Sequence, residues 1–157
     1  MKRYDIPQSL DTEHKELHEQ LKRAIDSGGR TGKAAKEVAE LLHPHFEKEE
    51  KYAMPPLGLL THLISQEDAE MTANVREYQN TILTMTNKLK EDLPNMLDEH
   101  KKIVSALEKL IDAANQENKP EYSDFAEKLK LHAQTEEEVL YPAAILVGEY
   151  LKTKSIH

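Results

Sequence analysis

The chain has 157 residues, of which 38% are hydrophobic and 32% charged, and its formal net charge is −8. It contains no cysteine, which excludes disulfides, thiolate zinc sites and iron–sulfur clusters, so any metal must be held by nitrogen and oxygen ligands. The acidic balance argues against binding to nucleic acid or to an anionic membrane surface. Because no apolar run approaches membrane-spanning length and the first ten residues lack the hydrophobic region of a signal peptide, we expect a cytoplasmic protein.

Helical periodicity and stop signals predict the first two helices. The first helix ends at Gly28 and Gly29, where a helix C-terminus favours glycine. Thr31 can cap the second helix, Pro44 predicts a kink within it, and Pro55–Pro56 closes it. The inner faces of these two helices are predicted to hold Leu10, His14, Leu17, Leu21 and Ala24, and then Val38, Leu42, His45, Glu49 and Tyr52.

A long periodic stretch follows over residues 66–115. The sequence leaves two interpretations open, namely one helix kinked at Pro94 or two helices, the second capped by Asp92. The last helix begins near Pro120 and is interrupted at Pro142. Its inner face is predicted to hold Phe125, Leu129, His132, Glu136 and Val139. Because no stretch shows the two-residue period of strands, we predict an all-α, up-and-down four-helix bundle.

Residues 59–93 are predicted to be an additional helical segment between bundle helices 2 and 3, within a single domain over residues 1–157. The apolar seam of this segment must be buried, either on the bundle of the same chain or on a second subunit. We favour burial within the same chain, and the sequence does not distinguish a monomer from a homodimer.

An internal repeat is the main signal in this sequence. In each copy a lone histidine is followed about thirty residues later by a His-x-x-x-Glu pair. The two copies consist of His14, His45 and Glu49, and of His100, His132 and Glu136. Both lone histidines sit in Glu-His-Lys triplets, and both pairs carry a second glutamate, Glu50 or Glu137, directly after the first. A proline lies ten residues after the histidine of each pair.

All six repeated side chains fall at inner-face positions that otherwise hold apolar residues. An unpaired carboxylate or imidazole in a helical core costs several kcal/mol unless it binds a partner such as a metal ion. A histidine and a glutamate four residues apart share one helix face and can reach one cation, and a lone histidine from the adjacent helix adds a second nitrogen. Each copy therefore predicts one half-site. Two half-sites make a dinuclear centre suited to iron, and also to manganese or zinc, with open positions for water or a small ligand.

The pattern resembles the hemerythrin-like (HHE cation-binding) domain, a four-helix bundle that holds a non-haem di-iron centre. The resemblance covers the first two helices and the stretch from Leu93 to about Leu146, and it implies two iron ions bridged by oxo, hydroxo or water, with Glu49 and Glu136 as carboxylate bridges. Carried over by position, the iron ligands are His14, His45, Glu49, His100, His132 and Glu136. Oxygen-carrying hemerythrins have a further histidine where this chain has Val104. The likeness is therefore closer to the bacterial and iron-sensing members of the family.

Three further residues are candidates to complete the metal shell. His18 either ligates a metal or is a surface residue that flanks the site, while Glu50 and Glu137 either coordinate or, as we favour, are solvated or support the ligands. The resemblance implies a di-iron protein that binds or reacts with dioxygen, nitric oxide or peroxide in sensing, scavenging or iron handling. The alternatives are a di-iron oxidase or peroxidase with true turnover, and a helical interaction module with a structural metal. Whether the protein is an enzyme is left open by the sequence.

Overall fold

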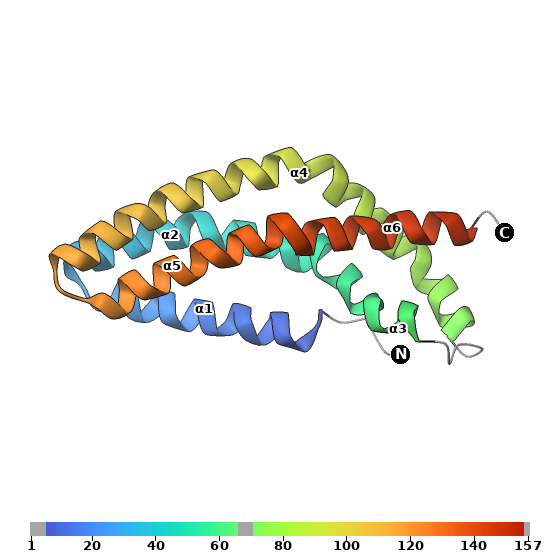
Figure 1. Cartoon of the computed structure of the whole chain (residues 1–157), viewed down its shortest axis with the longest axis horizontal. Coiled ribbons are helices and arrows are strands. Elements are labelled where there is room, and N and C mark those ends of the chain that lie inside the picture. The colour runs from blue at the N-terminus through green and yellow to red at the C-terminus, as the bar shows by residue number, and fades with distance from the viewer. Residues whose placement is uncertain (1–5, 66–70, 156–157) are drawn as a thin grey trace.

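The computed structural model describes residues 6–65 and 71–155. Within these ranges the chain is helical and contains no strand, which confirms the predicted all-α class (Figure 1). The elements are α1 (Gln8–Asp26), α2 (Gly29–Lys48), η1 (Glu49–Ala53), η2 (Pro55–Leu59), α3 (Leu60–Ile64), α4 (Met71–Gln116), α5 (Pro120–Thr135), η3 (Glu136–Leu140) and α6 (Tyr141–Ser155). Of these, η1 and η3 are π-helical turns and η2 is a 3₁₀ turn. None of the helices in these ranges combines the length and the hydrophobicity that a membrane crossing needs.

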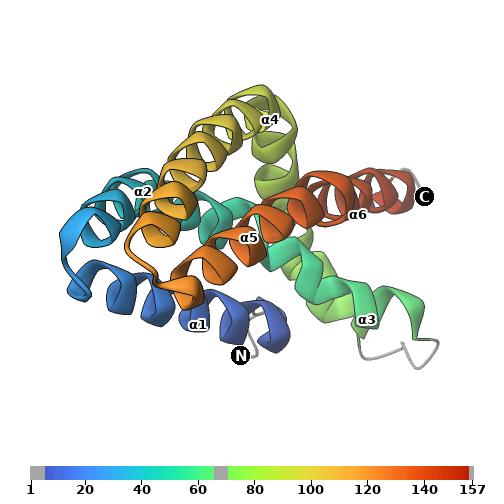
Figure 2. The same cartoon turned by 60° about the vertical axis from the view of Figure 1, so that its left-hand side comes forward.

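Helices α1, α2, α4 and α5 form the body of the molecule. α2 packs against α1 and α4, and α5 packs against α4 and α1, so these contacts close a ring of four helices. Successive helices of the ring run in opposite directions (Figure 1), which is compatible with the predicted up-and-down four-helix bundle. α6 continues α5 beyond this body and packs along the first part of α4 (Figure 2).

Two apolar clusters fill the bundle at different levels. The first includes Leu17, Leu42, Ile103 and Leu129. The second includes Tyr52, Leu89, Met96 and Tyr141. In α2, α4 and α5 the repeated polar residues lie in the sequence between members of these two clusters. The fold therefore places a polar layer between two apolar layers.

The junction between α1 and α2 is capped from a distant part of the sequence. α1 ends at Asp26, just before the predicted glycines, and Gly28 and Gly29 turn the chain into α2 with φ angles of 71° and 63°. Thr31 is not the N-cap that the sequence predicted, because α2 already begins at Gly29 and Thr31 is buried in its first turn. The carboxylate of Glu117, just after α4, caps the helix instead, since it accepts hydrogen bonds from the N–H groups of Arg30 and Thr31 and from the Thr31 hydroxyl.

Residues 71–116 form one helix, so the interpretation as a single helix is confirmed over this range. Pro94 lies inside α4, and Figure 1 shows the helix bending in its yellow-green part, as expected for a helix with an internal proline. Asp92 caps no second helix, and its carboxylate instead accepts a hydrogen bond from the Tyr52 hydroxyl. Pro44 also lies inside its helix, and α2 continues past it to Lys48.

The segment 59–93 is helical where the structure describes it, and its second half is the first part of α4. Where the side chains are described, the apolar residues of its seam are buried or partly buried within the chain. Ile82 packs with Leu59 and Val147, while Leu89 belongs to the second apolar cluster. The preference for burial in the same chain is therefore confirmed for these residues.

Both His-x-x-x-Glu pairs end in a π-helical turn. Glu49 and Glu136 begin η1 and η3, and their carbonyl oxygens accept hydrogen bonds from the N–H groups of the residues five positions later, Met54 and Tyr141. Each turn holds one residue more than an α-helical turn, so the residues that follow are rotated relative to a continuous α-helix. Val139, predicted on the inner face, is for this reason 55% exposed, whereas Tyr141 is buried.

Candidate metal centre

The six repeated residues meet in the polar layer of the bundle. α1 supplies one histidine, α4 another, and α2 and α5 with their π-turns supply the two His-x-x-x-Glu pairs. The side chains of all six are at most 7% exposed, so their burial, which the helical register predicts, is confirmed. Four helices thus deliver imidazoles and carboxylates to one buried level.

Five of these residues form two groups that could each hold a cation. The His14 group consists of His14, His132 and Glu136, and the His45 group consists of His45, His100 and Glu136. Within each group the ligand atoms lie within 4.8 Å of one another. Glu136 presents one oxygen to each group, because Oε1 is 3.2 Å from His100 Nε2 and Oε2 is 3.3 Å from His132 Nε2. It therefore spans the two groups in the manner of a bridging carboxylate.

The two groups combine the repeat copies differently from the prediction. The sequence predicted that each copy would build its own half-site, from helices adjacent in the chain. In the structure His14 of the first copy lies with His132 of the second, because α1 packs beside α5. His45 of the first copy lies with His100 of the second, because α2 packs beside α4. The lone histidines are thus exchanged between the copies, and this exchange follows from helix packing rather than from chain order.

Glu49 lies on the side of the His45 group, with its Oε1 atom 3.3 Å from His45 Nε2. Burial raises the pKa of Glu49 well above its usual range, and the nearby Glu136 adds to the rise. Although burial alone would raise the pKa of Glu136, the Glu49 carboxyl that donates to it and the neighbouring imidazoles of His100 and His132 hold that pKa below its usual range. Without a metal, Glu49 is therefore the protonated partner and Glu136 the anion. The bridging role predicted for Glu49 stays a prediction.

Carboxylates stand behind three of the imidazoles, on the side away from the centre. The paired Nδ1 and carboxylate groups are His45 with Glu99 at 2.8 Å, His100 with Glu137 at 3.0 Å, and His132 with Glu13. Because an ionised carboxylate only accepts hydrogen bonds, each Nδ1 donates its proton and each Nε2 directs a lone pair toward the centre. Metal-binding histidines are held in this way.

Glu13 and Glu99 bond to candidate ligands, which the sequence reasoning missed. They are the glutamates of the two Glu-His-Lys triplets, which the repeat did single out. Each supports a histidine of the other repeat copy rather than its own neighbour in the chain, so Glu13 serves His132 and Glu99 serves His45. The triplets were the signal, but only the packing of the helices shows which histidine each glutamate serves.

The support of His45 continues to the protein surface. Lys48 donates a hydrogen bond to Glu99, and its Nζ atom lies 3.9 Å from Asp92. Although burial alone would raise the pKa of Glu99, the hydrogen bonds from Lys48 and His45 lower it. Glu99 therefore stays ionised and fixes the tautomer of His45. Tyr52 is buried as predicted, and its hydroxyl donates to Asp92 rather than to a candidate ligand.

The polar atoms that face the centre need a positive partner. His45 Nε2 and His100 Nε2 are only 2.9 Å apart, and with both Nδ1 protons directed at carboxylates, the two neutral imidazoles would face each other with lone pairs unless a proton or a metal ion lies between them. Among the described residues, buried atoms without a hydrogen-bond partner are both ring nitrogens of His14, His132 Nε2, Glu49 Oε1 and Glu136 Oε2. One such atom left unsatisfied costs about 1–3 kcal/mol. Cations coordinated by these nitrogens and oxygens would satisfy them, and this donor set fits iron, manganese or zinc.

The three lower-ranked candidates stand at the edge of the centre. Glu137 bonds to Nδ1 of His100 and so supports that imidazole, which is one of the two roles we favoured. Glu50 lies 4.0 Å from His14 Nδ1 and is about half exposed. His18 belongs to neither group, because its ring stacks on His43 with the ring centroids 5.1 Å apart. The ring of Phe46 contacts both His18 and His14.

Tyr141 lies in the centre although the sequence reasoning missed it. Its Oη atom is 3.2 Å from His45 Nε2, 3.1 Å from His100 Nε2 and 3.2 Å from Glu49 Oε2. Burial raises the pKa of Tyr141 far above its usual range, and the neighbouring carboxyl groups of Glu49 and Glu136 add to the rise. A continuous α-helix would not turn this residue inward, so only the π-turn brings it to the centre. The available signal was the repeated proline, which follows the turn as Pro142.

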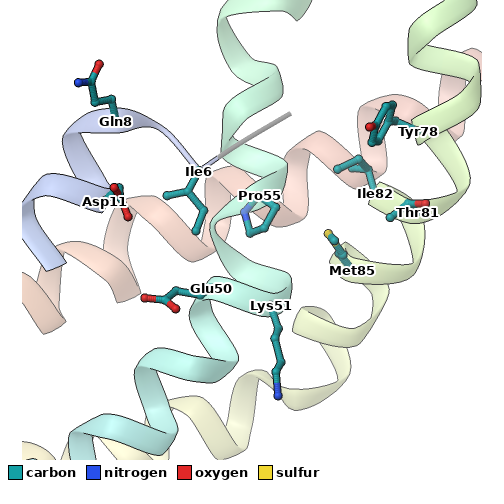
Figure 3. Close-up of a pocket in the computed structure, with 10 residues that line it drawn as sticks. All are labelled: Ile6, Gln8, Asp11, Glu50, Lys51, Pro55, Tyr78, Thr81, Ile82 and Met85. Atoms are coloured by element: carbon teal, nitrogen blue, oxygen red, sulfur yellow. The ribbon is translucent and has the colours of Figure 1, made fainter. Parts of the chain in front are cut away.

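Two surface hollows lie close to the His14 group, one lined by His132 itself and the other separated from the group by the side chain of Glu50. One has a volume of about 690 Å³ and lies between α1, η1 and α4 (Figure 3). Glu50 lines this pocket and is the residue 4.0 Å from His14. The other hollow, of about 750 Å³, lies between α1 and α5 and is lined by Glu13 and by His132 itself. A small molecule is therefore within one side chain of the His14 group.

Comparisons of the chain with protein-family models, with curated proteins and with solved structures found no match. Its function is accordingly inferred from the geometry and chemistry of the centre.

Proposed function

We propose that the chain is a hemerythrin-like, non-haem di-iron protein that binds or reacts with dioxygen, nitric oxide or peroxide, in sensing, scavenging or iron handling. The observation that carries this proposal is the buried layer in which imidazoles and carboxylates form two groups that share Glu136. Helical bundles are a common scaffold for such carboxylate-rich centres. When bound, a pair of iron ions would supply redox chemistry and open positions for a small ligand.

Some residues of the chain would bind the ions, and others would hold those ligands in place. His14 and His132 would hold one ion, His45 and His100 the other, and Glu136 would bridge the two. The surrounding glutamates fix the tautomer and the orientation of the imidazoles, as hydrogen-bonded carboxylates do around bound metals. The apolar clusters above and below the polar layer keep bulk water away from the nitrogen and oxygen atoms that face the ions.

Ligand binding is favoured over a purely structural metal by the number of donors. A structural site is saturated by protein ligands, whereas the His14 group offers three protein donors and, through His132, borders one surface hollow. Its unfilled positions are therefore close to solvent. An iron ion there would be accessible to a molecule of two or three atoms.

The first test is iron stoichiometry. Metal-free protein titrated with Fe²⁺ without air should bind about two ions per chain, and Glu136→Ala should lower the capacity at both positions because both groups use this carboxylate. Glu138→Ala is the matched control, since Glu138 is an exposed glutamate two residues away. Wild-type protein that binds no iron, or equal binding by Glu136→Ala and wild type, would contradict the proposal.

The second test separates ligand binding from the alternatives. Azide or nitric oxide added to the iron-loaded protein should change its optical spectrum and saturate at about one ligand per chain. A structural metal would be indifferent to both. Steady consumption of peroxide at rates well above those of free iron would instead identify a di-iron peroxidase with true turnover.

A further inference from the structure

The Tyr141 hydroxyl lies among candidate metal ligands rather than beside a single hydrogen-bond partner. Its Oη atom is between 3.1 and 3.2 Å from His45 Nε2, His100 Nε2 and Glu49 Oε2. A hydroxyl has one proton to donate, so it can serve only one of these three atoms as a donor. The near-equal distances indicate that all four atoms surround a common point.

The spacing of these atoms is that of ligands around one metal ion. In an octahedral site with bonds of about 2.1 Å, adjacent ligand atoms lie about 3.0 Å apart. The two Nε2 atoms are 2.9 Å apart, Glu136 Oε1 is 3.2 Å from His100 Nε2, and Glu49 Oε1 is 3.3 Å from His45 Nε2. The distances from Tyr141 Oη fall in the same range. The hydroxyl therefore occupies a place in this set equivalent to that of an imidazole nitrogen.

The other repeat copy has no equivalent of this tyrosine. Met54 precedes Pro55 just as Tyr141 precedes Pro142, and both follow a π-turn that begins at the glutamate of the pair. A thioether is a soft donor that suits iron poorly, whereas a phenolate oxygen is a known iron ligand. The two copies of the repeat therefore differ at this position, where only the second copy offers an oxygen donor.

We propose that Tyr141 is an oxygen ligand of the ion held by the His45 group, so that this ion receives five protein donors, whereas the His14 group, with three, keeps the open positions. The inference rests on the proposed di-iron function. On binding of Fe³⁺ the O–H bond of Tyr141 is replaced by an O–Fe bond, and one proton is released to solvent without any change in oxidation state. Exogenous ligands then bind at the His14 group, which borders the hollow between α1 and α5 through His132.

The test is an optical one on iron-loaded protein. Wild type, Tyr141→Phe and Tyr52→Phe are loaded with Fe²⁺, oxidised in air, and examined for iron content, for visible absorption and for phenolate ring modes in resonance Raman spectra. Tyr52 is the matched control because it is equally buried and its hydroxyl bonds to Asp92. Wild type and Tyr52→Phe should show a phenolate-to-iron(III) band, and Tyr141→Phe should lose it while azide affinity changes less than about threefold.

The outcomes distinguish the ligand role of Tyr141 from the di-iron function on which it rests. A wild-type protein that binds two iron ions but shows no phenolate band overturns the ligand role of Tyr141 and leaves the di-iron function intact. A phenolate band that persists in Tyr141→Phe also overturns the ligand role of Tyr141. Loss of azide binding in Tyr141→Phe contradicts the assignment of the open positions to the His14 group. Failure of the wild type to bind iron is a different result, since it refutes the di-iron function itself. The wild-type spectrum remains decisive even if Tyr141→Phe does not fold.

Discussion

Replacement of His14 by leucine should have opposite effects on the metal-free and the iron-loaded protein. His14 is 2% exposed, its ring stacks on Phe46, and neither ring nitrogen has a hydrogen-bond partner among the described residues. In a metal-free core these nitrogens lower the stability of the fold, because they lose their hydrogen bonds to water and gain no other partner. With iron bound, one of them would become a ligand that leucine cannot replace.

The expected size of the effect follows from these contacts. Removal of an unsatisfied buried polar group should stabilise the metal-free fold by about 1–3 kcal/mol. For a chain of this length each kcal/mol shifts Tm by about 2–4 °C, so a gain near 2 kcal/mol raises Tm by about 4–8 °C. In the wild type, iron at a free concentration of 100 times Kd should add about 2.7 kcal/mol, which the variant should lose in large part.

The difference should also depend on pH. Burial lowers the pKa of His14 from 6.5 to about 4, so the unfolded chain takes up a proton in this range that the folded chain does not. The metal-free wild type therefore loses stability through this group as the pH falls from about 6.5 to about 4. The advantage of His14→Leu should grow over the same interval.

The assay is urea unfolding of both proteins, once with a chelator and once with Fe²⁺ in the absence of air. The order of the two midpoints should reverse between the conditions. Leu21→Ala is the control, because Leu21 lies in the same helix and in the first apolar cluster, and its loss should cost about 2–5 kcal/mol in both conditions. If His14→Leu is less stable than wild type without metal and iron stabilises neither, His14 is an ordinary core residue and the reasoning fails.

Three further outcomes are expected. Glu99→Gln should weaken iron binding about 10–100-fold, because the amide no longer holds His45 as a charged acceptor, and an unchanged affinity relative to the exposed-site control Glu91→Gln would count against this support. The pKa of Glu117 is lowered to about 2, first of all by its hydrogen bond from the Thr31 hydroxyl, so its contribution to stability is complete above about pH 4.5 and disappears as the pH falls through about 2. Glu117→Gln should therefore lower Tm at pH 7 and have little effect near pH 2, and equal losses at both pH values would show that the charge is irrelevant. Gly148→Ala should lower the urea midpoint by an amount equivalent to about 1–3 kcal/mol, since the added Cβ would lie 2.1 Å from Thr86 Oγ1, and a variant as stable as wild type would show that α4 and α6 can move apart freely.

The inward direction of the candidate ligands could be predicted from sequence because it depends on local geometry. A histidine and a glutamate four positions apart share a helix face whatever else the chain does. His45 with Glu49, and His132 with Glu136, were therefore recognisable from periodicity alone, and all four side chains are buried. The repeat added the expectation that the two pairs act together.

The partners of these residues could not be predicted in the same way. Which lone histidine joins which pair depends on the neighbours that each helix acquires in the bundle, and the spacing of residues along one helix does not contain that information. The prediction of Thr31 as the N-cap failed for the same reason, since the carboxylate that caps the helix belongs to Glu117, 86 positions from Thr31. Tyr141 was missed for a different reason, because a π-turn adds one residue and cancels the register on which the prediction depended.

The crossed arrangement couples metal binding to formation of the whole bundle. Each group joins two helices from different copies of the repeat, α1 with α5 and α2 with α4, and Glu136 links the two groups. The supporting carboxylates cross between the copies as well, from Glu13 to His132 and from Glu99 to His45. Neither copy can therefore complete its own group with its own support. Since the unfolded chain offers no preformed site, the free energy of metal binding becomes free energy of folding. Metal should accordingly stabilise all four helices as one cooperative unit, with equal gains in hydrogen-exchange protection on α1 and α4, and protection confined to one helical hairpin would show that the groups do not act across the bundle.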